Sequence, residues 1–244
     1  LALTLGNAAL FDLPAGPVGF VINGMGYRSA DNYIYAVDSN TGDLYRIDGN
    51  GGATALGRPG GMPDIASYPA GDVSPDGTHL VLLAVSGGFN GSTEAIISIN
   101  LETPGHPATV KYFPANNSAV YDIAFDPTDE TLYGWDALNQ RLVIIDLEAG
   151  QILAPFAPDV RGGTLGSVFF DAFGNLFGYG SSLGSGNQNT FFRIDKMTGK
   201  ATIEAAGPPP PPNHRITNPK TLQKKKPVAP LQTKPNNQQT YYIK

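Results

Sequence analysis

Aromatic and β-branched residues alternate along several short stretches of the chain, and turns rich in Asp, Asn, Gly and Pro separate these stretches. In one of them, Tyr33, Tyr35 and Val37 alternate with Ile34 and Ala36. A period of two residues in such side chains is typical of strands half-buried between neighbouring sheets. No segment carries the 3.6-residue apolar stripe of a surface helix. The pattern predicts an all-β fold.

The same pattern recurs four times, over residues 22–57, 70–113, 121–156 and 166–207. Each repeat opens with a strand of small residues, crosses an Asp/Pro/Gly turn and continues through an aromatic strand. Its last apolar strand ends at an Asp or Asn before a glycine turn. These end marks, separated by 52, 46 and 49 residues, are Asp48, Asn100, Asp146 and Asp195. Such a period is typical of a four-stranded propeller blade. With the segment LALTLG at the start as one strand of an incomplete blade, we predict a β-propeller of about five four-stranded blades.

The openings of the four repeats also carry a family resemblance. They read INGMGY, GDVSPDG, DIAFDPTDETLYGWD and GSVFFDAFGNLFGYG, and two strands end in LYRID and FFRID. In this order they resemble a family of secreted bacterial β-propellers of unknown function, over about residues 1–207. The resemblance implies a secreted propeller and brings no known activity or catalytic residues. Members of that family carry a further TLYSID-like strand before the segment that matches LALTLG. We therefore expect another segment to complete the fifth blade here.

Charge divides the chain into two parts. Residues 1–207 contain all 21 acidic residues and nine Lys or Arg, a net charge of −12, whereas residues 208–244 contain seven Lys or Arg and no acid. We therefore predict a propeller over 1–207 and an extended Pro/Lys-rich basic tail over 208–244. The sequence has no cysteine, which excludes disulfides, thiolate zinc sites and a cysteine nucleophile. The apolar runs are too short to cross a membrane as a helix, and a first residue other than Met fits either a processed mature protein or a shortened chain.

The tail contains nine prolines among 37 residues, five of them consecutive at Pro208–Pro212, and its composition is typical of a segment that does not order by itself. Its end, 240–243, can nevertheless form a strand. A terminal strand can be added to a sheet edge, and the incomplete blade at Leu1–Gly6 is a natural acceptor. The strand could close its own ring or that of a neighbouring subunit, and the second arrangement would build an open filament. The predicted interface residues are Leu1, Leu3, Leu5, Lys224, Lys225, Lys226, Tyr241, Tyr242 and Ile243.

The first strand of each propeller blade lines the central axis, and the openings place Asn23, Asp72 and Asp122 there, with Ser167 at the same level of the fourth blade. Converging oxygen atoms could hold a cation, and calcium is the metal that suits them. Alternatively, these side chains bond to backbone amides of the neighbouring blade and brace the ring. Secreted propeller lactonases hold calcium in such a place, which keeps a calcium-dependent hydrolase as an alternative function.

Other motifs give weaker signals. His79 and His106 fall in turns and His214 falls in the tail, so neither a Ser–His–Asp triad nor a zinc site is indicated. Acidic turns such as DSNTGD, with Asp38 and Asp43, match only part of a calcium loop and are more often simple turns. The lysine run suits phosphate groups, but the acidic body argues against nucleic-acid binding.

These observations favour a protein that is not an enzyme. We predict a secreted structural or adhesive protein at the cell surface, a subunit of an extracellular filament or surface assembly, which associates with itself through the tail. The alternatives are the lactonase-like hydrolase and a propeller that binds surface glycan.

Overall fold

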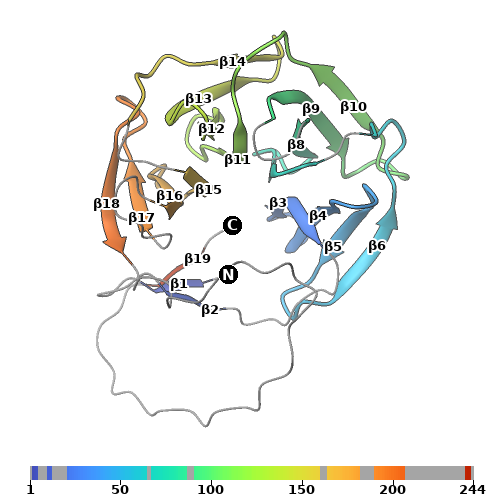
Figure 1. The fold of residues 1–244 in the computed structure, drawn as a ribbon. Helices are drawn as coiled ribbons and strands as arrows, with labels where there is room; N and C mark the ends of the chain where they lie inside the picture. Colours follow the sequence, from blue (N-terminus) through green and yellow to red (C-terminus); the bar gives the residue numbers. More distant parts are fainter. Residues whose placement is uncertain are drawn as a thin grey trace, which may run out of the picture.

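Four antiparallel sheets follow one another around a ring in the computed structural model, and a smaller fifth sheet stands in the remaining gap (Figure 1). The structure describes residues 2–4, 10–12, 21–64, 67–86, 91–159, 164–181, 190–206 and 240–242. Over these ranges every regular element is a strand, and no helix is long and apolar enough to cross a membrane. The predicted all-β propeller is confirmed.

Each of the four large sheets is one continuous stretch of chain. The first contains β3 (Ile22–Arg28), β4 (Tyr33–Asp38), β5 (Leu44–Ile47) and β6 (Ala53–Gly57), and the second contains β7 (Ala70–Val73), β8 (His79–Val85), β9 (Thr93–Asn100) and β10 (Ala108–Tyr112). The third contains β11 (Val120–Phe125), β12 (Leu132–Asp136), β13 (Arg141–Asp146) and β14 (Gln151–Leu153), and the fourth contains β15 (Thr164–Phe170), β16 (Leu176–Ser181), β17 (Thr190–Ile194) and β18 (Ala201–Ala206). We call them blades 1 to 4. In every blade the strands pair in chain order. The first strand of each blade is the inner one, and successive inner strands are in contact, β3 with β7, β7 with β11 and β11 with β15.

The fifth sheet is assembled from both ends of the chain. It contains β1 (Ala2–Thr4), β2 (Leu10–Asp12) and β19 (Thr240–Tyr242), in the order β19-β1-β2. The register pairs Leu3 with Phe11 on one side and with Tyr241 on the other. The terminal segment therefore forms a strand beside β1 of its own chain, which is the within-chain alternative. The predicted count of about five four-stranded blades needs correction, because the described residues form four such blades and one three-stranded sheet.

Several predicted residues fall outside the part of the chain that the structure describes. They are Leu1, Leu5, Lys224, Lys225, Lys226 and Ile243, together with His214 and the boundary near Gly207.

The hydrophobic core is divided among the seams between blades. Blades 1 and 2 share a cluster that contains Val37, Leu44 and Ile97, and further clusters join blades 2 and 3 and blades 3 and 4. Trp135 and Phe192 meet in the last of these and are fully buried. The alternation seen in the sequence thus reflects strands that present one face to each neighbouring blade.

Blade 4 also carries an aromatic cluster on its other face. The rings of Phe169, Phe177 and Phe191 are stacked with centroids 5.2–5.9 Å apart, and these residues are buried. Phe191 precedes Phe192 on β17, so the two side chains lie on opposite faces of the sheet. Because Phe192 faces blade 3, the stacked rings face the side of the ring where the fifth sheet stands (Figure 1).

The Asp-rich turns between strands are stabilised locally. Asp38, Asp48, Asp171 and Asp195 each accept a hydrogen bond from the backbone N–H two residues further on, at 2.8–2.9 Å. This is the geometry of an Asx turn. In the DSNTGD turn, the carboxylate of Asp43 accepts the hydroxyl of Thr41. These carboxylates therefore serve the turns, in agreement with the simpler reading of the sequence.

Glycines bring the inner strands of blades 1 and 2 very close together. A Cβ atom at Gly26 would lie 2.3 Å from the backbone nitrogen of Val73, and one at Gly71 would lie 2.6 Å from the backbone of Gly24. Gly24 also has a φ of +58°. Side chains larger than hydrogen do not fit at this contact, which explains the small residues at the start of these repeats.

Candidate functional site

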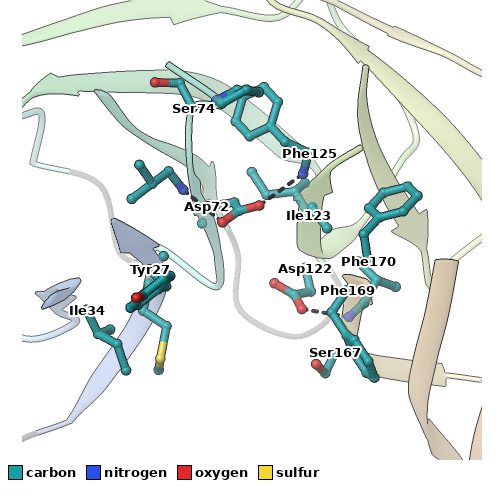
Figure 2. A pocket seen from close by; sticks show the side chains of 18 of the residues that line it. Tyr27, Ile34, Asp72, Ser74, Asp122, Ile123, Phe125, Ser167, Phe169 and Phe170 are labelled. Carbon is teal, nitrogen blue, oxygen red and sulfur yellow. Dashed lines mark hydrogen bonds between the residues drawn. The ribbon is translucent and has the colours of Figure 1, made fainter. Parts of the chain in front are cut away.

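A cavity of about 320 Å³ lies on the axis, between the four inner strands. Figure 2 shows Asp72 and Asp122 directed into it, with Ser167 nearby. The described residues that line it on blades 1 and 2 are Asn23, Gly24, Met25, Gly26, Tyr27, Ser29, Ile34, Gly71, Asp72, Val73, Ser74, Pro75 and Gly77. Those on blades 3 and 4 are Asp122, Ile123, Ala124, Phe125, Pro127, Gly166, Ser167, Val168, Phe169 and Phe170. All four predicted axial residues therefore line one cavity.

Asp72 links blade 2 to blade 3. Its Oδ1 accepts the backbone N–H of Val73 at 2.8 Å, and its Oδ2 accepts the backbone N–H of Phe125 in the next blade at 3.0 Å. Asp122 repeats this arrangement one blade further on, since its Oδ2 accepts the backbone N–H of Val168 at 2.7 Å. Both carboxyl groups make the bracing contacts that the sequence had suggested as the alternative to a cation site.

The two carboxyl groups occupy different positions along their own strands. Asp72 is one step from Val73, the last paired residue before the hairpin turn. Asp122 lies further from its own turn, in a bulge between Val120 and Ile123. Ser167 lies at a similar depth, three steps from Phe170. Bulges and hairpin lengths differ between the blades, so the aligned residues lie at different numbers of residues from their turns.

The surroundings of Asp122 favour its protonated form. Enclosure by protein is the main cause, and the negative charge of Asp72 adds to it. Hydrogen bonds from the amides of Val168 and Ile123 and from Ser167 oppose both effects without cancelling them. Together they raise the pKa of Asp122 to about 8. The axis therefore holds a carboxyl group that carries a proton at pH 7.

Asn23 completes the predicted set from blade 1. Its Oδ1 accepts the backbone N–H of Gly24 at 3.2 Å, and the side chain is exposed. With Asp72 and Asp122 it offers two carboxyl groups and one amide, whereas calcium takes six to eight oxygen ligands. Among the described residues, no group of three or more acidic, His or Cys side chains could hold a metal. The predicted metal site thus stays a prediction that would need backbone or water oxygens.

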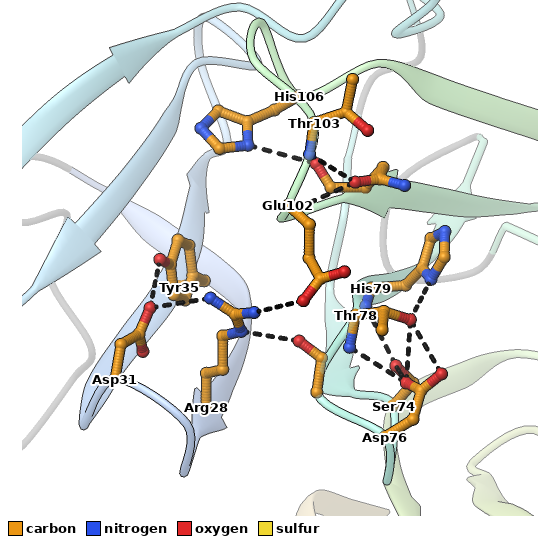
Figure 3. Close-up of polar contacts among 12 residues, drawn as sticks. Arg28, Asp31, Tyr35, Ser74, Asp76, Thr78, His79, Glu102, Thr103 and His106 are labelled. Carbon is orange, nitrogen blue, oxygen red and sulfur yellow. Dashed lines mark hydrogen bonds and ion pairs between the residues drawn. The ribbon is translucent and has the colours of Figure 1, made fainter.

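His79 and His106 lie at hairpin ends, outside the lining of this cavity (Figure 3). Nδ1 of His79 is 2.6 Å from the hydroxyl of Thr78, and Nδ1 of His106 is 3.1 Å from the carbonyl oxygen of Asn100. Neither is within the cavity lining. A hydrolase of the lactonase kind would need a base at the cavity mouth, and no histidine in the described lining supplies one.

A polar clamp formed by Arg28 joins blades 1 and 2 and could not be predicted from the sequence (Figure 3). Arg28 donates to the carboxylate of Asp31 at 3.0 Å, to that of Glu102 at 3.2 Å and to the carbonyl oxygen of Gly77 at 2.6 Å. Its partners in blade 2 are distant in sequence, so no local motif announces the clamp. The only feature of the sequence that points to this clamp is Arg28 itself, at the end of INGMGYR and three residues before Asp31.

A second clamp joins blades 4 and 3. Lys196 donates to the carboxylate of Asp126. Burial of Asp126 favours its protonated form, but hydrogen bonds from Lys196 and Thr128 outweigh that effect and lower the pKa of Asp126. The hydrogen bond to Asp126 raises the pKa of Lys196. Both groups are therefore charged at neutral pH, and the pair supports the seam between these blades.

The repeats and the ring identify the family. A family described as a repeat of unknown function (DUF6923) matches residues 10–210. The chain belongs to this family. The match spans β2 to β18, so all four blades of the DUF6923 repeat lie within it. No curated protein matches the chain in sequence.

Solved structures share the fold of this DUF6923 chain at low sequence identity. A catalytically inactive virginiamycin B lyase from Staphylococcus aureus, crystallised with quinupristin, is 16% identical with a TM-score of 0.50, over 80% of this chain and 58% of the lyase. TolB from Acinetobacter baumannii is 16% identical with a TM-score of 0.51, over 77% of this chain and 44% of TolB. A chain of a nidogen/laminin complex is 12% identical with a TM-score of 0.51, over 82% and 66%.

This chain thus spans about half to two thirds of the structures it resembles. One of them is a lyase and the other two are not named as enzymes. At these sequence identities they establish the propeller fold alone.

Proposed function

We propose that this protein is a secreted structural subunit that builds an extracellular assembly at the cell surface by donating its C-terminal strand to the next copy. The pairing of β19 with β1 carries the proposal. In that pairing three residues from one end of the chain meet three from the other, with Ala2 opposite Tyr242 and Thr4 opposite Thr240. The same hydrogen bonds can form within one chain or between two, which is the condition for strand exchange.

The aromatic cluster of blade 4 is a second argument that each subunit needs a strand in the position of β19. Phe169, Phe177 and Phe191 form a stacked aromatic cluster on the face of blade 4 that is turned away from blade 3. A monomeric protein rarely leaves so continuous an apolar patch open to water. A ring that lacks β19 would also expose the edge of β1, and open edges recruit further strands. Each subunit therefore needs a terminal strand, from itself or from a neighbour.

The composition of the segment between β18 and β19 supports the second source. The segment covers residues 207–239 and contains all nine prolines of the tail. Proline-rich connections favour extended conformations of about 3.1 Å per residue. A stiff connection reaches further than a glycine-rich one, so it lowers the effective concentration of β19 at its own β1 and favours a neighbouring ring.

Charge supports the same arrangement. The body carries −12 and residues 208–244 carry +7, so the tail of one subunit is attracted to the propeller of another. Attraction of this kind accelerates encounter and weakens with salt. Assembly by strand donation should consequently slow as the ionic strength rises.

Assembly of the full chain tests the proposal. We expect polymers in negative-stain electron microscopy at high protein concentration, and we expect a chain without residues 240–244 to remain monomeric in sedimentation. A chain without residues 243–244 alone keeps β19 and is the matched control, which should still polymerise. A full chain that stays monomeric at every concentration, or equal assembly without residues 240–244, would contradict the proposal.

A further inference from the structure

We propose that the axial cavity binds a primary ammonium group carried on an aliphatic stem. The site is independent of strand exchange, because it is formed by the inner strands of blades 1 to 4. Its volume of about 320 Å³ lies at the lower end of the range for small-molecule sites. The ligand is therefore small or is a single side chain.

The charge of the lining selects a cation. Asp72 and Asp122 face the cavity from neighbouring blades, and the described lining contains no Lys, Arg or His. The propeller around it is also strongly acidic. A concave site lined by one sign of charge concentrates ions of the opposite sign. An anionic ligand would meet repulsion here without any compensating donor of positive charge.

The acceptors suit an ammonium group better than a divalent metal. An ammonium has three N–H donors and no acceptor, and it can be held by three oxygen atoms. Oxygen groups reach the cavity from Asp72, Asp122, Asn23 and Ser167. Calcium would require six or more oxygens.

The wall of the cavity formed by blade 1 is apolar and suits an aliphatic stem. Met25 is 40% exposed although it is apolar, and Tyr27 and Ile34 are half-buried beside it. All three belong to blade 1, whereas both carboxyl groups belong to blades 2 and 3. A ligand with a charged end and an apolar stem can satisfy both sides, and burial of the stem adds about 0.8 kcal/mol per methylene.

Binding should release a proton. An ammonium next to Asp122 favours the ionised carboxylate, so the proton that this group carries at pH 7 passes to solvent. The side chains that act on Asp122 are Asp72 on β7, whose negative charge raises its pKa, and Ser167 on β15, whose hydrogen bond lowers it. Release should disappear near pH 9, where Asp122 is already ionised.

Isothermal titration of the full chain with 1,5-diaminopentane tests the site. We expect saturable binding at pH 7, with a heat that depends on the ionisation enthalpy of the buffer and indicates release of up to about one proton. The isosteric 1,5-pentanediol, which lacks the charge, should give no saturable heat. Equal binding of the diol, no saturable heat with the diamine, or tighter binding of calcium than of the diamine would overturn the proposal.

Substitutions distinguish binding in the axial cavity from a general attraction of cations to the acidic protein. Asp122→Asn keeps an oxygen acceptor for the amide of Val168 and should weaken diamine binding at least tenfold without proton release. Asp129→Asn, at an exposed turn acid, is the matched control and should change affinity less than twofold. Met25→Lys provides a second test that leaves both carboxyl groups intact, since its own ammonium should occupy the cavity and abolish binding. Full affinity in Met25→Lys, or equal losses in Asp122→Asn and Asp129→Asn, would count against the site.

The ammonium could come from a free amine or from a lysine side chain. A peptide of residues 221–229, which contains Lys224, Lys225 and Lys226, distinguishes the two sources. Competition of this peptide with the diamine, absent when its lysines are acetylated, would assign the site to a lysine segment. Diamine binding without peptide binding would assign it to a small amine.

Discussion

The seams between consecutive blades and the seam closed by the two chain ends are built in different ways. Blades 3 and 4 are neighbours in sequence, and their seam combines the buried core around Trp135 and Phe192 with the Lys196 clamp and the bond from Val168 to Asp122. The closing seam instead contains a three-stranded sheet, held by three residue pairs on each side of β1, in the gap next to blade 4.

This difference separates the part of the fold that forms locally from the part that depends on a distant segment. Each blade is a meander of adjacent strands, so its contacts form at low cost in chain entropy. The fifth sheet joins residues at opposite ends of the chain. A seam of this kind is the place where a ring can open or exchange a strand, and blade 4 presents one face to each type of seam.

Of the two neighbouring phenylalanines on β17, Phe192 should cause the larger loss of stability when it is replaced by Ala. It is fully buried against blade 3, and we expect Phe192→Ala to lower the free energy of unfolding by about 3–5 kcal/mol, because it leaves a cavity in a seam that cannot collapse. Denaturant unfolding followed by circular dichroism measures this. Phe173→Ala, at a residue that is 84% exposed, is the control and should change stability by less than about 0.5 kcal/mol.

The stability cost of Phe191→Ala should depend on the presence of the terminal strand, whereas that of Phe192→Ala should not. We expect Phe191→Ala to cost about 2–3 kcal/mol in the full chain, since its ring is buried in the aromatic cluster. In a chain without residues 240–244, we expect the same substitution to cost less than about 1 kcal/mol, because we infer that the fifth sheet, which stands on this side of blade 4, shields the cluster from water. A double-mutant cycle in denaturant unfolding measures this coupling. A cost of Phe191→Ala that stays the same in both chains would show that the cluster does not depend on β19.

The same comparison explains what could be predicted from the sequence. The 46–52-residue period and the Asp turns predict the blades, because these features arise from contacts within one repeat. Thr240 to Tyr242 could be recognised as a strand, but its partner could not be chosen, since own and neighbouring rings offer the same edge. The Arg28 clamp and the depth of Asp72 escaped prediction for a related reason. They depend on distant partners and on bulges that change the register.

The smallest effect that distinguishes the inner seams is their dependence on pH. The pKa of Asp122 is raised to about 8 in the folded protein, against about 3.9 for an unfolded Asp. Between these values the folded state holds one more proton than the unfolded state. The contribution of Asp122 to stability is therefore fully present below about pH 4 and is lost as the pH rises through 8. One proton sets a ceiling of about 1.4 kcal/mol per pH unit.

Because the cavity admits some solvent, we expect a loss of about 1–2 kcal/mol between pH 6 and pH 8. Asp76, Asp126 and Asp195 have lowered pKa values and titrate below this window. Denaturant unfolding at intervals of half a pH unit measures the slope, which Asp122→Asn should flatten and Asp129→Asn should leave unchanged. A slope that persists in Asp122→Asn would assign the titration to another group. Phe191→Ala should leave the slope intact as well, because the closing seam contains no part of the contact between Asp122 and Val168.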